Sequence, residues 1–188
     1  MYEAKNYEHL LGLKGFSDGL LQNHFGLYEG YVKNTNLLLE RLKSLSLGTP
    51  EYSETQRRFG WEWNGMRLHE LYFGNLTKES TGNIEETLLE KIQKSFGSLE
   101  DFKKNFIGIG SMRGIGWVAL VYDEKVDALF NVWINEHDGG HLVGVTPLLI
   151  MDVFEHAFIL DYGMKRLEYI ESFMKAIDWE IVGKRLSE

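Results

Sequence analysis

The stretch TPLLIMDVFEHAF, residues 146–158, places an apolar run directly before an acid and a histidine. Residues 147–151 are predicted to form a short strand, after which the chain is expected to turn into a helix. Asp152 and His156 stand four residues apart at that change, a spacing at which a carboxylate and an imidazole can converge. The pair alone is weak evidence for a metal, because the same spacing also occurs between a helix cap and an ordinary polar residue.

Two more strands are predicted upstream of this stretch. WVALVYD (117–123) and DALFNVWIN (127–135) are rich in β-branched and aromatic residues, and a short charged turn at 123–126 separates them. This pattern is typical of an antiparallel hairpin. Together with residues 147–151, the hairpin predicts a small three-stranded antiparallel sheet.

The N-terminal part is predicted to be helical. Over residues 17–45 the apolar residues recur at three- and four-residue spacing, which predicts a long helix capped by Ser17 or Asp18 and ended at Gly48. A second helix is predicted over residues 50–73, with proline in its first turn. The short corner between the two predicts an antiparallel helical hairpin.

Shorter helices are predicted in the rest of the chain. IEETLLEKIQKSF follows Asn83 as a cap and is stopped by Gly97. Ser98 with Asp101 resembles a capping box that opens the next helix, and the tail over residues 166–184 is predicted to be helical. The fold class is therefore α+β: a helical hairpin domain over residues 1–80, then an α+β domain over residues 81–188 that holds the sheet.

Composition excludes several kinds of site. The 188 residues contain no cysteine, so any metal must bind to nitrogen and oxygen. The formal net charge of -8 argues against nucleic-acid and membrane-surface partners. The opening MYEAKNYEHL carries charges where a secretory signal needs an apolar run, and no stretch approaches the roughly 18 apolar residues that span a bilayer. We therefore expect a cytoplasmic protein with no membrane partner.

Two histidines extend the pair at residues 152 and 156. His24 lies on the apolar face of the first predicted helix, and His69 lies among apolar residues of the second. Each one alone is more often a buried histidine satisfied by a neighbour. Because the two helices are predicted partners, the joint arrangement with Asp152 and His156 favours a metal site of three nitrogens and one oxygen between the two domains.

The residues that suggest a family follow one another along the chain. They are His24 with Tyr31-Val32, His69 with Leu71-Tyr72-Phe73, KSFGSLEDFKKNF (94–106), Gly116-Trp117, TPLLIMDVFEHAF (146–158) and DWEIVGKRL (178–186). In this order they resemble landmarks of the iron/manganese superoxide dismutases, from about residue 9 to residue 185. The D-x-[WF]-E-H element over residues 152–156 is the most specific of them.

The resemblance implies a function and a set of ligands. His24, His69, Asp152 and His156 would bind one iron or manganese ion per chain, with a water or hydroxide as fifth ligand. The enzyme would be a superoxide dismutase, an oxidoreductase that converts superoxide into dioxygen and hydrogen peroxide. The resemblance also implies a homodimer or a dimer of dimers, in which Glu155 reaches the last histidine ligand of a second copy.

The resemblance also assigns residues around the metal. The family usually holds the bound solvent with a glutamine at one of two places, which here are Gly65 and His137. We therefore expect His137 to hydrogen-bond the solvent, the alternative being a solvated loop histidine. Tyr31 matches a gateway tyrosine that helps deliver protons. It follows His24 by seven residues instead of the usual eight, which predicts an α-helix without a π-bulge.

Other assignments concern the substrate funnel. Tyr28 stands where the family commonly has a funnel histidine, and Ile159 replaces a tyrosine. Arg166, beside Lys165, matches a basic residue at the funnel mouth that would attract the anionic substrate. Aromatic residues are expected to wall the pocket: Trp117 first, with Trp61, Trp63, Tyr72 and Phe154 as further candidates.

Two other functions stay open at this point. The altered positions Tyr28 and Ile159 leave room for a metal-binding protein of the same fold with little activity. A metal-dependent hydrolase with Glu155 or Glu136 as the base is less favoured, because four protein ligands and an apolar wall leave little space for an extended substrate.

Overall fold

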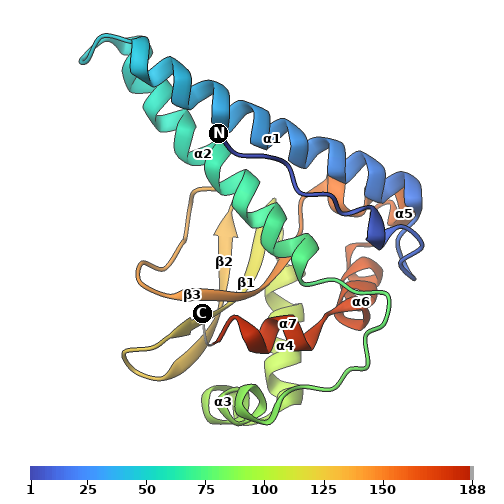
Figure 1. Ribbon diagram of the computed structural model, residues 1–188. Coiled ribbons are helices and arrows are strands. Elements are labelled where there is room, and N and C mark those ends of the chain that lie inside the picture. Colours follow the sequence, from blue (N-terminus) through green and yellow to red (C-terminus); the bar gives the residue numbers. More distant parts are fainter. Residues whose placement is uncertain (187–188) are drawn as a thin grey trace.

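A computed structural model describes residues 1–186. Figure 1 shows a long helical hairpin on one side of a small sheet, with shorter helices around the rest. In chain order the elements are η1 (Glu8–Leu10), α1 (Asp18–Ser44), α2 (Pro50–Gly74), α3 (Glu86–Phe96), α4 (Leu99–Gly110), β1 (Gly116–Asp123), β2 (Ala128–Asn135), β3 (Thr146–Asp152), η2 (Glu155–Ala157), α5 (Ile159–Tyr162), α6 (Arg166–Ala176) and α7 (Trp179–Lys184). The predicted α+β fold class is confirmed.

The hairpin of α1 and α2 forms as predicted. The Ser17 hydroxyl accepts a hydrogen bond from the Leu20 amide and caps α1, and Thr49 caps α2 with Pro50 in its first turn. Helix α1 ends at Ser44, a turn before Gly48, which has a positive φ of 80° in the connecting loop. Helix α1 is α-helical throughout, so the prediction of a helix without a π-bulge is confirmed.

The sheet is antiparallel with the strand order β2-β1-β3. All three strands were predicted, and β1 lies in the centre. Its register places Trp117 opposite Ile134 of β2 on one side and opposite Asp152 of β3 on the other. The central strand therefore brings the Trp117 side chain to the end of β3, next to the acid that follows the apolar run.

The start of α3 differs from the prediction. The helix begins at Glu86, and its N-cap is Glu85 without a side-chain cap, not Asn83. The Asn83 amide instead donates a hydrogen bond to the Thr81 hydroxyl, so this residue belongs to a turn in the connecting segment. Gly97 ends the helix with a φ of 86°, and Ser98 caps α4 by accepting from the Asp101 amide, as predicted.

The C-terminal tail also differs, because the predicted single helix is two. Helix α6 ends at Ala176, and Ile177 adopts an extended conformation and bridges to Leu76. Asp178 then caps α7 by accepting from the amides of Glu180 and Ile181. The break is a tertiary effect, since pairing of Ile177 with the segment after α2 competes with helix formation.

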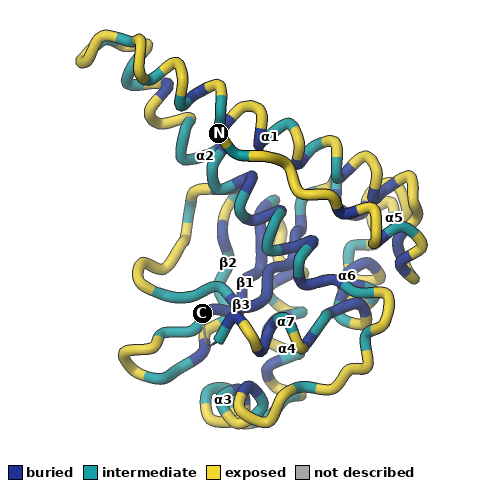
Figure 2. Tube along the Cα trace, viewed as in Figure 1, coloured by how far each residue is buried: buried dark blue, intermediate teal, exposed yellow. Residues whose placement is uncertain are grey.

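One hydrophobic cluster joins the two predicted domains. Buried residues of α1 and α2, such as Leu21 and Met66, belong to the same cluster as Leu120 and Ile150 of the sheet. Figure 2 shows that burial is concentrated where the hairpin lies on the sheet and that the far end of the hairpin is mostly exposed. The division into residues 1–80 and 81–188 stays a prediction. Within residues 1–186, no helix has the length and apolarity to cross a membrane.

Candidate metal centre

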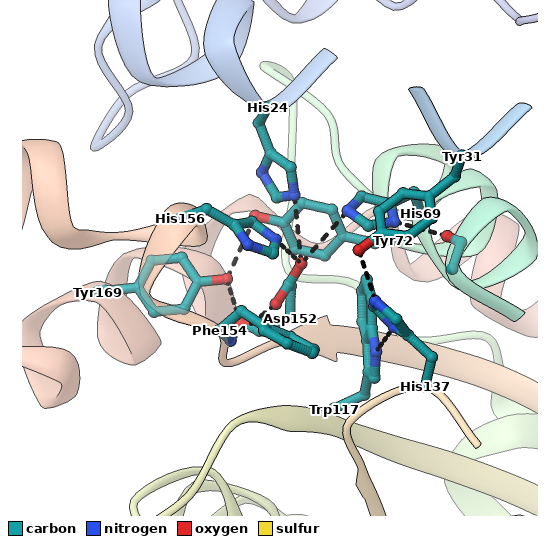
Figure 3. A network of polar contacts seen from close by, with 11 residues as sticks. His24, Tyr31, His69, Tyr72, Trp117, His137, Asp152, Phe154, His156 and Tyr169 are labelled. Carbon is teal, nitrogen blue, oxygen red and sulfur yellow. Dashed lines mark hydrogen bonds and ion pairs between the residues drawn. The ribbon is translucent and has the colours of Figure 1, made fainter. Parts of the chain in front are cut away.

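Four residues from four different elements meet where the hairpin rests on the sheet. His24 comes from α1, His69 from α2, Asp152 from the end of β3 and His156 from η2. Their potential ligand atoms all lie within 4.8 Å of one another. The structure thus brings together the four residues that the sequence singled out (Figure 3).

One oxygen of Asp152 lies at the centre of this group. Its Oδ2 is 3.0 Å from His156 Nε2, 3.2 Å from His24 Nε2 and 3.7 Å from His69 Nε2. The other oxygen, Oδ1, accepts a hydrogen bond of 2.8 Å from the Phe154 amide. This backbone contact fixes the carboxylate, so that Oδ2 faces the three imidazoles.

The His69 imidazole is held with its Nε2 lone pair directed at the carboxylate. Its Nδ1 lies 2.6 Å from the Gly65 carbonyl, and because a carbonyl can only accept, Nδ1 carries the proton. Nε2 is then a bare acceptor, and it is buried without a hydrogen-bond partner among residues 1–186. Such an atom costs about 1–3 kcal/mol unless it binds something. A metal ion is the partner that fits, since a ligating histidine typically donates its other N–H to a carbonyl or carboxylate.

The protonation states also suit a metal. Burial lowers the pKa of His24 and lowers the pKa of His69 further, so both imidazoles are neutral at pH 7, the form that binds metals. For Asp152, burial opposes the charge, but the attraction and hydrogen bonds of His156 and His24 outweigh it and hold the pKa well below its usual range. Three imidazoles and one carboxylate are donors that suit iron or manganese.

A second group of hydrogen bonds adjoins the four residues. Trp117 Nε1 lies 3.1 Å from His137 Nδ1, and His137 Nε2 lies 2.7 Å from the Tyr31 hydroxyl (Figure 3). An indole N–H can only donate, so His137 Nδ1 must be the acceptor and the proton of the neutral ring must sit on Nε2. Burial lowers the pKa of His137 to about 4, which keeps the ring neutral.

This tautomer determines what Tyr31 can do. Because His137 Nε2–H donates to the Tyr31 oxygen, the hydroxyl proton of Tyr31 is free to be donated elsewhere. Burial raises the pKa of Tyr31 to about 12, so the proton is present at neutral pH. The expected hydrogen bond from His137 to a bound solvent stays a prediction, and the partners of its two nitrogens here are Trp117 and Tyr31.

Gly65 makes room for the Tyr31 ring. A Cβ atom at residue 65 would lie 2.5 Å from Tyr31 Cδ1, which is closer than carbon atoms approach. The ring of Tyr31 also lies 5.1 Å from that of His69. No side chain at residue 65 fits beside this tyrosine, so the polar partner of Tyr31 comes from residue 137 instead.

Aromatic rings surround the four residues. Trp117 meets His69 edge-on at 4.9 Å, Trp61 meets His137 at 4.8 Å, and Tyr72 lies 5.2 Å from His24. Phe154 stacks on His137 and on His156 at 4.8 and 5.1 Å. Trp63 is the exception, because it packs 5.1 Å from Tyr2 on another side of α2, and its expected place in the wall is wrong.

One contributing residue had no sequence signal. The Tyr169 hydroxyl donates a hydrogen bond of 2.7 Å to the Asp152 carbonyl. It also lies 3.2 Å from the Tyr72 hydroxyl, which must then be the donor between the two. Through these hydrogen bonds the two buried tyrosines fix the position of the end of β3. Tyr169 stands 13 residues after His156 on α6, outside any of the motifs.

The other residues that the sequence singled out lie outside the four-residue group. The Tyr28 ring is buried, and its hydroxyl bonds with Glu70 at 3.1 Å and with the Lys5 amide at 3.0 Å, so its polar atom does not line an opening. Arg166 donates to the carbonyls of Met112 and Gly114, both at 2.7 Å. Lys165 pairs with Glu168, and Ile159 and Glu155 are exposed at the surface.

Known proteins of similar sequence identify the family of this chain. Residues 84–185 match the family described as iron/manganese superoxide dismutases, C-terminal domain. An iron superoxide dismutase of Aquifex pyrophilus is 32% identical over 99% of this chain and 91% of its own length. One from Cupriavidus metallidurans is 33% identical over 93% of this chain and 90% of its own. A manganese superoxide dismutase of Haloarcula marismortui is 40% identical over 62% of this chain and 57% of its own. The chain belongs to the iron/manganese superoxide dismutase family.

Proposed function

We propose that this protein is a superoxide dismutase that binds one iron or manganese ion through His24, His69, Asp152 and His156. The net reaction converts two superoxide anions and two protons into dioxygen and hydrogen peroxide. The observation that carries the proposal is the bare, buried Nε2 of His69, which faces the same carboxylate oxygen as two further imidazoles. The relatives named as iron and manganese superoxide dismutases support the activity.

The metal and the protein have separate tasks. An iron or manganese ion held by these four residues would supply the one-electron redox chemistry that the net reaction needs. The chain supplies three imidazoles and one negatively charged carboxylate, which stabilise a cation. Its aromatic wall limits the space at the site to a small substrate and excludes bulk water.

Tyr31 is proposed as the proton donor. Formation of peroxide requires two protons, and the Tyr31 hydroxyl proton is free because its oxygen accepts from His137. This hydrogen bond stabilises the charge that develops on the tyrosine oxygen as the proton leaves. Tyr31 is only partly buried, so water can restore the proton. Trp117 is a positioning residue that holds His137 in the required tautomer.

A homodimer is proposed on the basis of two groups without partners. The Glu155 carboxylate is exposed and forms no hydrogen bond or ion pair within residues 1–186. The His156 side chain is 28% exposed, and its Nδ1 has no partner in the same part of the chain. Glu155 of one copy can accept from His156 Nδ1 of the other. The exposed apolar residues Ile159, Leu160, Met164 and Leu167 follow these two in the sequence and would be covered as well.

The dimer is tested by sedimentation of the wild-type protein and of Glu155→Ala, with Glu171→Ala as the control on a nearby helix. We expect wild-type dimers that are weakened only in Glu155→Ala. A monomer at micromolar concentration would contradict the proposal. We also propose a cytoplasmic location.

Activity is tested by loading metal-free protein with iron, manganese or zinc separately. Bound metal per chain and superoxide consumption are then measured on each sample. We expect one ion per chain, with activity in the iron or the manganese form and none in the zinc form. One ion per chain with negligible consumption would contradict the proposed activity and favour a metal-binding protein of the same fold. Hydrolytic activity only with zinc would favour a hydrolase.

A further inference from the structure

Three residues of α2 form a cluster, and the proposed function uses none of its charges. This entrance cluster consists of Arg58, Trp61 and Glu62. The Arg58 guanidinium lies over the Trp61 ring, 5.1 Å from its centroid, and its Nη2 and Nε are 2.7 and 2.8 Å from Glu62 Oε1. Asn34 of α1 donates to the other oxygen of Glu62 at 3.2 Å. The carboxylate is 3% exposed, whereas the Arg58 side chain is 51% exposed.

The entrance cluster adjoins the Tyr31–His137 pair. The Trp61 ring meets the His137 ring edge-on at 4.8 Å. Asn34 stands three residues after Tyr31 on α1, about one helical turn away. Burial dominates the pKa of both Tyr31 and His137, and the charge of Arg58 lowers the pKa of each. The positive charge is therefore felt at both members of the pair.

Partly exposed aromatic rings lie beside the buried residues of the metal centre on this side. His69, Trp117, His137 and Asp152 are fully buried, whereas Tyr31, Trp61 and Phe154 are only partly buried. The Tyr31 ring lies 5.1 Å from that of His69, and the Trp61 ring lies 4.8 Å from that of His137. Arg58 is the exposed cation stacked on one of them.

We infer that Arg58 guides the superoxide anion to the opening beside Tyr31. This inference rests on the proposed function. The chain has a net charge of -8, and its field repels an anion unless a local positive charge offsets it. Glu62 adds a negative charge close to Tyr31, and Arg58 covers that charge while its guanidinium faces solvent. Arg166, expected in this role from the sequence, donates from Nη1 and Nη2 to two backbone carbonyls.

The geometry requires arginine in particular. A planar guanidinium can stack on an indole ring and bond with a carboxylate at the same time, whereas a lysine ammonium keeps only the charge. Glu62 acts as a positioning residue, because a buried carboxylate fixes the orientation of its partner. Removal of Arg58 alone would leave this carboxylate unpaired next to the opening, so its effect should exceed that of a lost surface charge.

The test compares Arg58→Met, Arg58→Lys and Arg58→Met/Glu62→Gln with Arg57→Met. The control removes the same charge one residue away, where Arg57 pairs with Glu54 and both are exposed. Two quantities are measured on the metal-loaded protein. One is kcat/KM for superoxide as a function of salt, and the other is the Kd of azide, an anionic probe, from an optical titration of the trivalent metal. Metal content and thermal unfolding show whether each variant is folded.

At low salt we expect Arg58→Met to lower kcat/KM and weaken azide binding by about three- to tenfold each. The double variant should recover most of this loss, because it removes the unpaired carboxylate. Arg58→Lys should lie between Arg58→Met and the wild type, and Arg57→Met should change both quantities less than about twofold. High salt should reduce all differences.

Equal effects of Arg58→Met and Arg57→Met would overturn the inference. A double variant as impaired as Arg58→Met would overturn the part assigned to Glu62. The azide titration separates this outcome from a failure of the proposed function. A wild-type protein that binds metal but consumes no superoxide would end the proposed function, while azide affinity would still report on the charge of Arg58.

Discussion

Gly65 packs against Tyr31, the proposed proton donor, so a change at this residue should affect both stability and activity. Gly65→Ala places a Cβ atom 2.5 Å from Tyr31 Cδ1 and displaces the ring that bonds with His137. Overpacking costs about 1–3 kcal/mol, which exceeds the gain of up to about 1 kcal/mol when alanine replaces glycine in a helix. We expect urea unfolding to show a net loss of stability and kcat to fall.

The matched control is Gly60→Ala in the same helix, where a Cβ atom would meet nothing within 4 Å. This variant should gain stability by up to about 1 kcal/mol and keep its activity. If both alanine variants gain stability alike, the contact between Gly65 and Tyr31 does not constrain the protein.

We expect His137→Ala to affect turnover without affecting metal binding. It lies outside the four-residue group, so His137→Ala is expected to keep one metal ion per chain. Activity should fall by about 100-fold or more, because Tyr31 loses the donor that stabilises its oxygen. His141→Ala is the control, since His141 lies in the same loop and, within residues 1–186, its side chain hydrogen-bonds only with the His137 carbonyl, at 2.8 Å. Unchanged activity in His137→Ala, with metal retained, would remove this residue from the mechanism.

For single residues, the sequence predicts the four candidate metal ligands better than the residues that surround them. Asp152 and His156 are readable from a short motif, and His24 and His69 from their helices. Trp61 and Trp63 could not both face the site, because residues two positions apart on a helix point about 200° apart. The structure places Trp61 at the site. The pairing of Tyr169 with Tyr72 joins residues 97 apart, which no local pattern encodes.

Among the elements, the β1–β2 hairpin is linked to α3 by ion pairs of the Asp127 carboxylate. The Asp127 carboxylate contacts Lys91 and Lys94, and it accepts a hydrogen bond of 2.9 Å from Tyr122. Hydrogen bonds from Lys91, then Lys94 and Tyr122, hold the pKa of Asp127 well below its usual range. Its φ of 50° is positive, a conformation that asparagine tolerates as well. Asp127→Asn therefore removes the charge without adding backbone strain.

The sign of the pH effect follows from this lowered pKa. A carboxylate whose folded pKa is depressed stabilises the fold fully above its unfolded pKa of about 3.9, and the stabilisation is lost as the pH falls toward the folded pKa. The unfolding free energy of the wild type should exceed that of Asp127→Asn by a constant amount from pH 5 to pH 7 and by less below about pH 4.

Denaturant titrations across this pH range measure the difference. Asp123→Asn serves as the control, because the Asp123 side chain accepts only from the Lys125 amide. A difference that is independent of pH between 3 and 7 would show that the two lysines do not stabilise the folded state through the charge of Asp127.

Elements whose stability is local were predictable, and those set by tertiary contacts were not. Helices α1 and α2 have caps and long apolar periodicity, and the strands alternate with clear turns. The break at Ile177 depends on its bridge to Leu76, about 100 residues away in the chain. The late start of α3 has a local cause that the cap pattern missed, because the Asn83 amide bonds with Thr81 two residues away and outside the helix.

For the whole molecule, the metal centre joins parts of the chain that are distant in sequence. His24 and His69 belong to the hairpin, whereas Asp152 ends the last strand and His156 follows it. An ion bound by all four residues cross-links the hairpin to the sheet, and it stabilises only the folded state in which the four converge. A separate folding of residues 1–80 and 81–188 stays a proposal, since the buried cluster extends across this boundary.

Metal removal should therefore lower the unfolding temperature of the entire protein. A ligand that binds only the folded state adds about 4 kcal/mol when its free concentration is a thousand times its Kd. The informative quantity is the gain on adding iron or manganese to metal-free protein, measured by calorimetry. We expect a large gain in unfolding temperature for the wild type and for His141→Ala. Almost no gain is expected for His24→Ala, which removes a ligand of the hairpin, or for Asp152→Ala, which removes a ligand of the sheet. A gain in Asp152→Ala as large as in the wild type would mean that the ion binds elsewhere, since the Asp152 oxygen is the atom that all three imidazoles face.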